Sequence, residues 1–300
     1  MFSSASVAEA GTGLGMPEAG VVGFSSPLPA DGLLRATFQL VPGLGPTRER
    51  RLWDAGITDW ALAPNIPPGL LPDALHTQLL RKLELVETAL AARDLPTLAR
   101  ALPTRELWRL YPAFADRAIY LDIETESEAG ITAIGLFDHA RGPRILLAGR
   151  DLASFVAEVP VGTLLVTFNG ASFDVPVLRR AFPHWEPPPA HVDLRAVWIR
   201  LGQWGGLKHI EEVQGVGRPA HLRGVDGHAA MWMWRQAQHG NREALRRFAE
   251  YNLYDAINLR GLLVLAHNRL AAATGLGVPQ MAPFSRGDVL YDLSKLLLSL

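Results

Sequence analysis

The chain has 300 residues, of which 48% are hydrophobic and 20% are charged, with a formal net charge of -1. This composition is typical of a globular protein large enough for one sizeable domain and a smaller module. The absence of cysteine excludes disulfides, thiolate metal sites and cysteine nucleophiles, so any metal ion would need oxygen or imidazole ligands.

The charge pattern gives a weaker indication of function. The near-neutral total provides no overall basic field for nucleic acid. Between residues 195 and 247, however, nine Lys and Arg stand against four Asp and Glu, which suggests a surface that faces phosphate. The first residues lack a basic segment followed by an apolar one, and no stretch of about 18 apolar residues occurs, so we expect a cytoplasmic protein.

Residues 1–32 are rich in Gly, Ala, Ser and Pro without periodicity, which predicts a disordered tail. A helical module is expected over residues 33–112. It opens with two short helical segments around the sequence PGLG, which contains Gly43 and Gly45, and Thr47 is the expected N-cap of the second segment. This turn resembles a helix-hairpin-helix, in which Gly43 and Gly45 would bind a substrate phosphate through backbone amides. A tight helix connection without a ligand is the alternative.

Two more helices are expected in this module, over residues 71–92 and 95–101, because apolar residues recur there at helical spacing. The connector that follows contains Trp108 and Tyr111. We expect both aromatic side chains to be packing anchors rather than ligand contacts.

After residue 118 the pattern changes to alternating strands and helices. The expected strands are residues 118–125, 131–138, 144–149, 162–169 and 190–194. The expected helices are residues 152–159, 175–182, 228–238, 241–270 and 287–300. Three adjacent strands followed by strands joined through helices predict an α/β fold with a mixed sheet and helices on its faces. We expect this domain to span residues 113–270, with a linker and helix over residues 271–300.

The first of these strands carries two acids, Asp122 and Glu124, near its end. Since successive strand side chains point to opposite faces, the two carboxylates share one face. Two like charges so close together need a counterion. The segment is therefore either a surface strand with its polar face in water or half of a divalent-metal site.

Two later segments offer further carboxylates. Asn169 precedes a turn, and Asp174 follows at the start of the helix expected next, where a lone Asp usually caps the helix or interacts with its dipole. Tyr251 and Asp255 lie on one face of the long late helix because they are four residues apart. Taken alone, they would be an ordinary surface pair.

In this order, the motifs D-x-E, N-x3-F-D and Y-x3-D resemble the three exonuclease motifs of the DEDD superfamily, in its DEDDy branch. The segments FNGASFDVPVL, HVDL, GLKHIE and YNLYD resemble the YprB-type ribonuclease H-like proteins of that superfamily. The resemblance covers residues 38–268, including the hairpin-like segment. The N-x3-F-D and Y-x3-D motifs are also similar to those of the proofreading domain of family-B DNA polymerases.

The resemblance implies a ribonuclease H-like fold and a metal-dependent nuclease, most often a 3'-5' exonuclease, with two Mg²⁺ or Mn²⁺ ions. It implies that Asp122 bridges both ions, that Glu124 and Asp255 complete the ion on the nucleophile side, and that Asp174 reaches the other. Tyr251 would orient the attacking water.

The expected partner is nucleic acid, either DNA or RNA, bound at a single-stranded end. Asn169 would hydrogen-bond the terminal nucleotide or hold its own turn, and Lys208 is either a phosphate contact or a solvated lysine. We expect His191 to pack at a strand end and Asp193 to cap the next helix. The alternatives to an exonuclease are a catalytically silent nucleic-acid-binding module and a structure-selective endonuclease.

Overall fold

The computed structural model describes residues 31–127, 130–282 and 291–300. The disordered tail expected over residues 1–32 lies outside the described residues, apart from its last two positions. Asp31 lies in a turn, and Gly32 begins the first helix.

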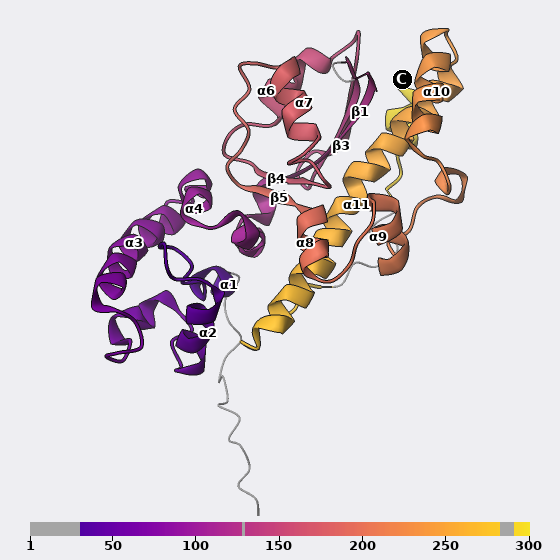
Figure 1. Cartoon of the computed structure of the whole chain (residues 1–300). Helices are drawn as coiled ribbons and strands as arrows, with labels where there is room; N and C mark the ends of the chain where they lie inside the picture. The colour runs from indigo at the N-terminus through magenta and orange to yellow at the C-terminus, as the bar shows by residue number, and fades with distance from the viewer. Residues whose placement is uncertain (1–30, 128–129, 283–290) are drawn as a thin grey trace, which may run out of the picture.

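A group of short helices precedes the sheet and lies to one side of it (Figure 1). Its elements are α1 (Gly32–Arg35), α2 (Pro46–Asp54), η1 (Trp60–Asn65), α3 (Asp73–Ala91), α4 (Leu95–Ala101), η2 (Thr104–Leu110), α5 (Tyr111–Phe114) and η3 (Ala115–Arg117). The helices predicted over residues 71–92 and 95–101 are confirmed as α3 and α4. Trp108 and Tyr111 are buried, as expected of packing anchors.

The hairpin-like segment differs from its prediction. The helix before the PGLG turn, α1, is a single turn that ends at Arg35. The N-cap of α2 is Gly45 rather than Thr47, because Pro46 occupies the first helical position, where its fixed φ and missing N–H are tolerated. Gly43 has a φ of 91°, a backbone conformation that favours glycine.

The five strands in the described residues form one mixed sheet, as predicted. They are β1 (Ala118–Ser127), β2 (Gly130–Asp138), β3 (Gly142–Leu147), β4 (Leu164–Thr167) and β5 (His191–Asp193). The strand order is β3-β2-β1-β4-β5. β1 pairs antiparallel with β2 and parallel with β4, so the central strand joins a meander to a parallel half.

The register places the two acids of β1 at a particular point of the sheet. β4 pairs only with Ala118–Tyr120 of β1, whereas β1 continues to Ser127 beside β2. Asp122 and Glu124 therefore lie inside β1 rather than at its end, but beyond the carboxyl end of the β4 pairing. One edge of their strand is thus free of β4.

The remaining helices cover the sheet on both sides. They are η4 (Leu152–Ser154), α6 (Phe155–Glu158), α7 (Asp174–Ala181), α8 (Leu194–Arg200), α9 (Leu207–Gln214), η5 (Ala220–Leu222), α10 (Gly227–Gln238), α11 (Arg242–Thr274) and α13 (Ser294–Leu298). The C-terminal helix expected over residues 287–300 is helical only over Ser294–Leu298 in the described part, and residues 287–290 lie outside it. No helix in the described ranges is both long and apolar enough to cross a membrane.

The alternation of β1 assigns its side chains to two cores. Ile119, Leu121 and Ile123 pack in the cluster that includes residues of α6 and α7. Tyr120 packs in the cluster on the opposite face, which includes residues of α11. Since positions two apart share a face, Asp122 lies on the side of the sheet that α11 crosses (Figure 1).

Candidate active site

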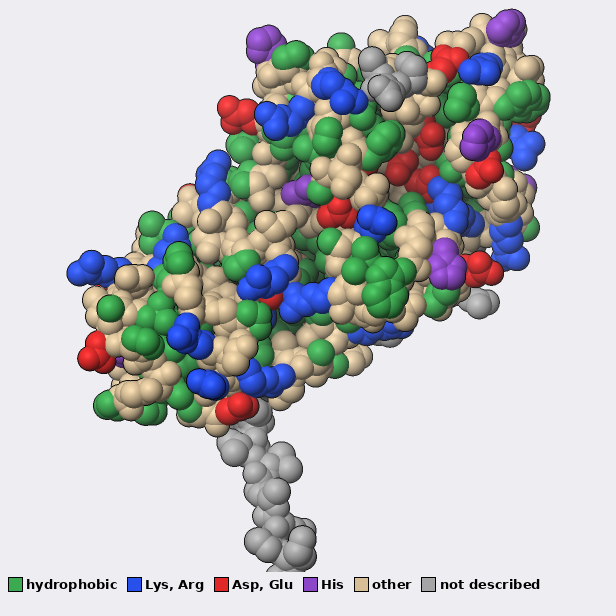
Figure 2. Space-filling model, viewed as in Figure 1, with side chains coloured by type: hydrophobic (Ala, Val, Ile, Leu, Met, Phe, Trp, Pro, Cys, Tyr) green, Lys and Arg blue, Asp and Glu red, His purple; other side chains and the backbone are tan. Residues whose placement is uncertain are grey.

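The acidic side chains of β1 meet one from α11. Oxygen atoms of Asp122, Glu124 and Asp255 all lie within 4.8 Å of one another. Asp255 is buried, whereas Asp122 and Glu124 are half-buried. The structure therefore brings together carboxylates that are 131 residues apart in the chain at their widest separation, as the ordered motifs predicted. Figure 2 shows acidic side chains gathered on the face that is in view, beside basic ones.

The fourth predicted carboxylate, Asp174, lies against the same strand but outside this group of three. It is buried in the first turn of α7, and its Oδ1 accepts a hydrogen bond of 3.2 Å from the backbone N–H of Ile123. Asp174 thus fixes α7 to β1 between the positions of Asp122 and Glu124.

Burial and mutual repulsion strongly perturb the acids. Burial, followed by the charges of Asp255 and Asp174, raises the pKa of Asp122 well above its usual value. Burial and then the charge of Asp255 raise the pKa of Glu124 to about 8. Burial likewise raises the pKa of Asp174 to about 7, against hydrogen bonds that lower it. Each anion lacks sufficient compensation from the protein, which is the condition that a bound cation relieves.

Asn252, on α11, orients the central acid. Its Nδ2 donates to Oδ2 of Asp122 at 2.8 Å and is 3.3 Å from the Asp122 carbonyl oxygen. The helix comes this close because the strand position opposite Asp122 is Gly135. A Cβ atom at Gly135 would lie 2.5 Å from Oδ1 of Asn252. The N of the YNLYD motif was not assigned a role from the sequence, although it matched the family pattern.

Two basic side chains already bind Asp255. Nζ of Lys208, in the second position of α9, lies 2.7 Å from Oδ1 and 2.5 Å from Oδ2. Nη2 of Arg218 also donates to Oδ1 of Asp255. The expectation of a solvated Lys208 is wrong, because the lysine makes an ion pair inside the site.

Arg218 is held in place by a second acid. Its Nε and Nη2 donate to the two carboxylate oxygens of Glu211 at 2.6 Å and 2.7 Å, and Nδ2 of Asn258 lies 3.0 Å from Glu211 Oε1. Arg218 comes from a segment that the sequence left unassigned as a lid or a plain loop. The buried Glu211 in GLKHIE was the one indication that a basic partner had to be nearby.

Tyr251 lies one helical turn before Asp255 and is buried. The Nζ of Lys208 lies 4.4 Å from the centre of its ring, within cation-π range. Burial and the charges of Asp255 and Glu124 raise the pKa of the phenol above its usual value. The Tyr251 hydroxyl therefore stays neutral at ordinary pH and is suited to orienting a water rather than to accepting its proton.

Asn169 and Asp193 form a turn beside the site. Asn169 has a φ of 66°, and its N–H donates to Oδ1 of Asp193 at 2.8 Å. Asp193 Oδ1 also accepts from the N–H of Arg195 at the start of α8, so its expected capping role is confirmed. His191 Nε2 lies 2.8 Å from Thr167 Oγ1 at the adjoining strand ends, in agreement with packing there. The structure gives Asn169 the role of holding its turn, and contact with a nucleotide remains a prediction.

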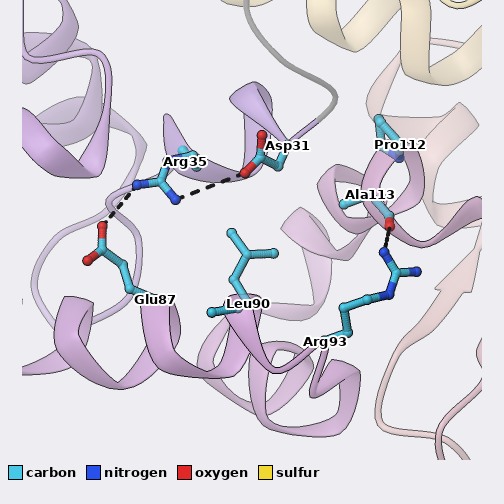
Figure 3. A pocket seen from close by; sticks show the side chains of 8 residues that line it. Asp31, Arg35, Glu87, Leu90, Arg93, Pro112 and Ala113 are labelled. Atoms are coloured by element: carbon cyan, nitrogen blue, oxygen red, sulfur yellow. Dashed lines mark hydrogen bonds and ion pairs between the residues drawn. The ribbon is translucent and has the colours of Figure 1, made fainter.

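The two cavities in the N-terminal helical region are lined by other residues. One, of about 450 Å³, is lined in part by Arg35, Glu87 and Arg93 (Figure 3). The other, of about 320 Å³, is lined by residues 39–45 and by α4 and its following turn. It includes Gly43 and Gly45, so these predicted phosphate contacts lie on a separate surface from the carboxylates.

The donor set fits a hard divalent cation. Every candidate ligand is a carboxylate oxygen, the type that Mg²⁺ and Mn²⁺ prefer. Lys208 and Arg218 both bind Asp255, whereas no ion pair is recorded for Asp122, Glu124 or Asp174 among the described residues. The residues present would therefore hold a metal ion mainly through the acids of β1.

A mixed five-stranded sheet, crossed by a long helix that completes a carboxylate cluster on the central strand, defines a ribonuclease H-like domain. A family model described as RNase_H superfamily matches residues 119–267, from β1 into α11. Searches of curated proteins and of solved structures gave no significant match. Membership of this superfamily indicates a nuclease-type activity on nucleic acid, supported by divalent metal ions.

Proposed function

We propose that the protein is a metal-dependent nuclease that hydrolyses phosphodiester bonds, most specifically a 3'-5' exonuclease of the DEDD type. One observation carries this proposal. Three carboxylates from β1 and α11 converge within 4.8 Å in a domain that matches the RNase H superfamily. The order of the D-x-E, N-x3-F-D and Y-x3-D motifs supports the DEDDy type.

Asp122, Glu124, Asp174 and Asp255 are the proposed ligands of two divalent ions in the substrate complex. Such ions activate water and stabilise the leaving oxygen in phosphodiester hydrolysis. Asn252 fixes the Asp122 carboxylate through its 2.8 Å hydrogen bond. The backbone of Ile123 similarly holds Asp174. The protein thus positions its ligands before substrate arrives, which reduces the reorganisation required for reaction.

Tyr251 and Lys208 complete the proposed site. The neutral phenol of Tyr251 orients the attacking water, since its raised pKa disfavours a role as base. Lys208 is the proposed contact to a substrate phosphate, because its ammonium is partly exposed and lies beside the carboxylates. Asn169 is the proposed contact to the terminal nucleotide. The turn that it forms with Asp193 lies at the ends of β4 and β5.

The test uses single-stranded DNA and RNA oligonucleotides that carry a label at either end. Wild-type protein and Asp122→Ala are incubated with Mg²⁺, Mn²⁺ or EDTA. We expect metal-dependent removal of single nucleotides from the 3' end by the wild type, and loss of this activity in the variant. Thermal unfolding of Asp122→Ala establishes that the variant is folded.

Other outcomes separate the alternative functions. Internal cuts would replace the exonuclease with a structure-selective endonuclease on the same carboxylates. Absence of cleavage under every condition, with nucleic-acid binding retained, would contradict the enzyme and favour a silent binding module.

A further inference from the structure

Asp255 is bound by two basic side chains that differ in freedom. The side chain of Arg218 is 7% exposed and that of Lys208 is 41% exposed, whereas Asp255 is 3% exposed. Arg218 is also fixed by its two bonds to Glu211. Lys208 contacts both oxygens of Asp255, yet most of its remaining surroundings are open enough for the ammonium to move away.

The charges around Asp255 are already matched. Asp255 and Glu211 provide two negative charges, and Lys208 and Arg218 provide two positive ones. A divalent ion bound by Asp255 would therefore lie close to the Lys208 ammonium, where like charges repel strongly in a partly buried site. The other three carboxylates, Asp122, Glu124 and Asp174, have no such counterions among the described residues.

We infer that Lys208 is an internal counterion that occupies Asp255 in the resting protein and limits the cluster to one divalent ion. The resting ion is bound through Asp122 and its neighbours on β1. The second ion can bind only when the ammonium leaves Asp255. This inference rests on the proposed function of the cluster, because it concerns how that metal site is loaded.

A substrate phosphate is the group that releases Lys208. A phosphodiester brought to the carboxylates offers the ammonium another anionic partner within reach of its flexible side chain. When Lys208 moves to this phosphate, the Asp255 oxygens that it occupied become available to a cation. Arg218 keeps its contact with Glu211 throughout, so it holds Asp255 in position while Lys208 exchanges partners. Loading of the second ion is thereby coupled to the arrival of nucleic acid.

The test counts bound Mn²⁺ ions in the full chain by titration calorimetry and by electron paramagnetic resonance of free Mn²⁺. Wild type, Lys208→Met and the control Lys82→Met, on α3, are compared without nucleic acid. We expect one ion in the wild type and in Lys82→Met, and two in Lys208→Met, because methionine removes the ammonium at similar side-chain length. Adding phosphorothioate DNA and RNA oligonucleotides, which resist cleavage, is expected to raise the wild-type count to two.

Each contrary result has a distinct meaning. Two ions in the resting wild type, or one in Lys208→Met, would overturn the counterion role of Lys208 and leave the nuclease proposal intact. An unchanged wild-type count with both oligonucleotides would overturn the release of Lys208 by phosphate. Absence of Mn²⁺ binding in every protein would contradict the metal site itself, and with it the proposed function.

Discussion

Individual side chains in the cluster link metal binding to pH. The raised pKa values of about 8 for Glu124 and about 7 for Asp174 mean that both groups bind protons more tightly in the folded than in the unfolded chain. The stability that they contribute is fully present below about pH 4 and is lost as the pH rises through 7 and 8. A divalent ion supplies the missing positive charge above that range.

We therefore predict that metal-free protein in EDTA is less stable at pH 8.5 than at pH 6, and that Mg²⁺ raises its melting temperature more at pH 8.5. The measurement is thermal unfolding at both pH values, with Glu124→Gln as the control. The variant should show a smaller pH effect and a smaller effect of Mg²⁺. A Mg²⁺ effect of equal size at both pH values, or in both proteins, would contradict the assignment of these acids.

Residues near the site differ in how well sequence could predict them. Asp122 and Glu124 were recognisable because strand alternation is a local property, and Asp255 because the motifs occur in a fixed order. Arg218 was not, since its role depends on a loop folding back onto α9 and α11 to reach Glu211. Asn252 was visible in a matched motif, but its contact with Asp122 required the packing of α11 against β1.

At the level of elements, the site depends on the close approach of α11 to the sheet. This approach occurs at Gly135 of β2, where a Cβ atom would lie 2.5 Å from Asn252 Oδ1 and 2.9 Å from its carbonyl oxygen. Neither atom can move without displacing the helix or breaking the bond to Asp122. The helix that carries Asp255 is therefore placed by the absence of a side chain on a neighbouring strand.

We predict that Gly135→Ala lowers the free energy of unfolding by about 1–3 kcal/mol, the usual range for an overpacked interior. It should also weaken Mn²⁺ binding, because Asn252 and Asp255 move with α11. Denaturant unfolding and Mn²⁺ titration measure the two effects. Gly162→Ala is the matched control, since a Cβ there would meet no atom within 4 Å. Equal stability and equal metal affinity in the two variants would contradict this account of α11.

Elements with a strong local pattern were predicted well from sequence. The limits of α4, residues 95–101, agree with the structure because Asp94 caps the helix through Thr97. The terminal helix was overestimated, since a run of leucines is equally compatible with a short helix that packs against α11. The hairpin was also misjudged at Thr47, because Pro46 was not given its preference for the first helical position.

Across the whole molecule, buried charges fasten the N-terminal helices together. Arg109 lies 2.8 Å from Glu106 and 3.4 Å from Glu49, and all three side chains are almost inaccessible to solvent. Arg109 also donates to the carbonyl oxygen of Leu33 at 3.1 Å, so one guanidinium joins α1, α2 and η2. Arg200 of α8 reaches Glu106 at 3.2 Å and extends the network to the ribonuclease H-like domain.

We predict that Arg109→Met destabilises the protein by about 3–5 kcal/mol, because it leaves buried carboxylates without their partner. The control is Asp116→Asn, which breaks an exposed 2.7 Å ion pair with Arg93 and should cost less than about 1 kcal/mol. Chemical denaturation of both variants provides the comparison. A loss for Arg109→Met no larger than that of the control would show that the buried network contributes little to stability.

The most direct test of the central claim is to locate the metal ion. Anomalous diffraction from crystals of the full chain grown with Mn²⁺ identifies the ion and its ligands. The account predicts a peak bound by carboxylate oxygens of Asp122 and a neighbouring acid, at the coordination distance of about 2.1 Å found for small octahedral cations. The same crystals of Asp122→Ala should lack it. Mn²⁺ bound elsewhere, with the Asp122 and Glu124 carboxylates free of metal, would contradict the assignment of this cluster as the catalytic centre.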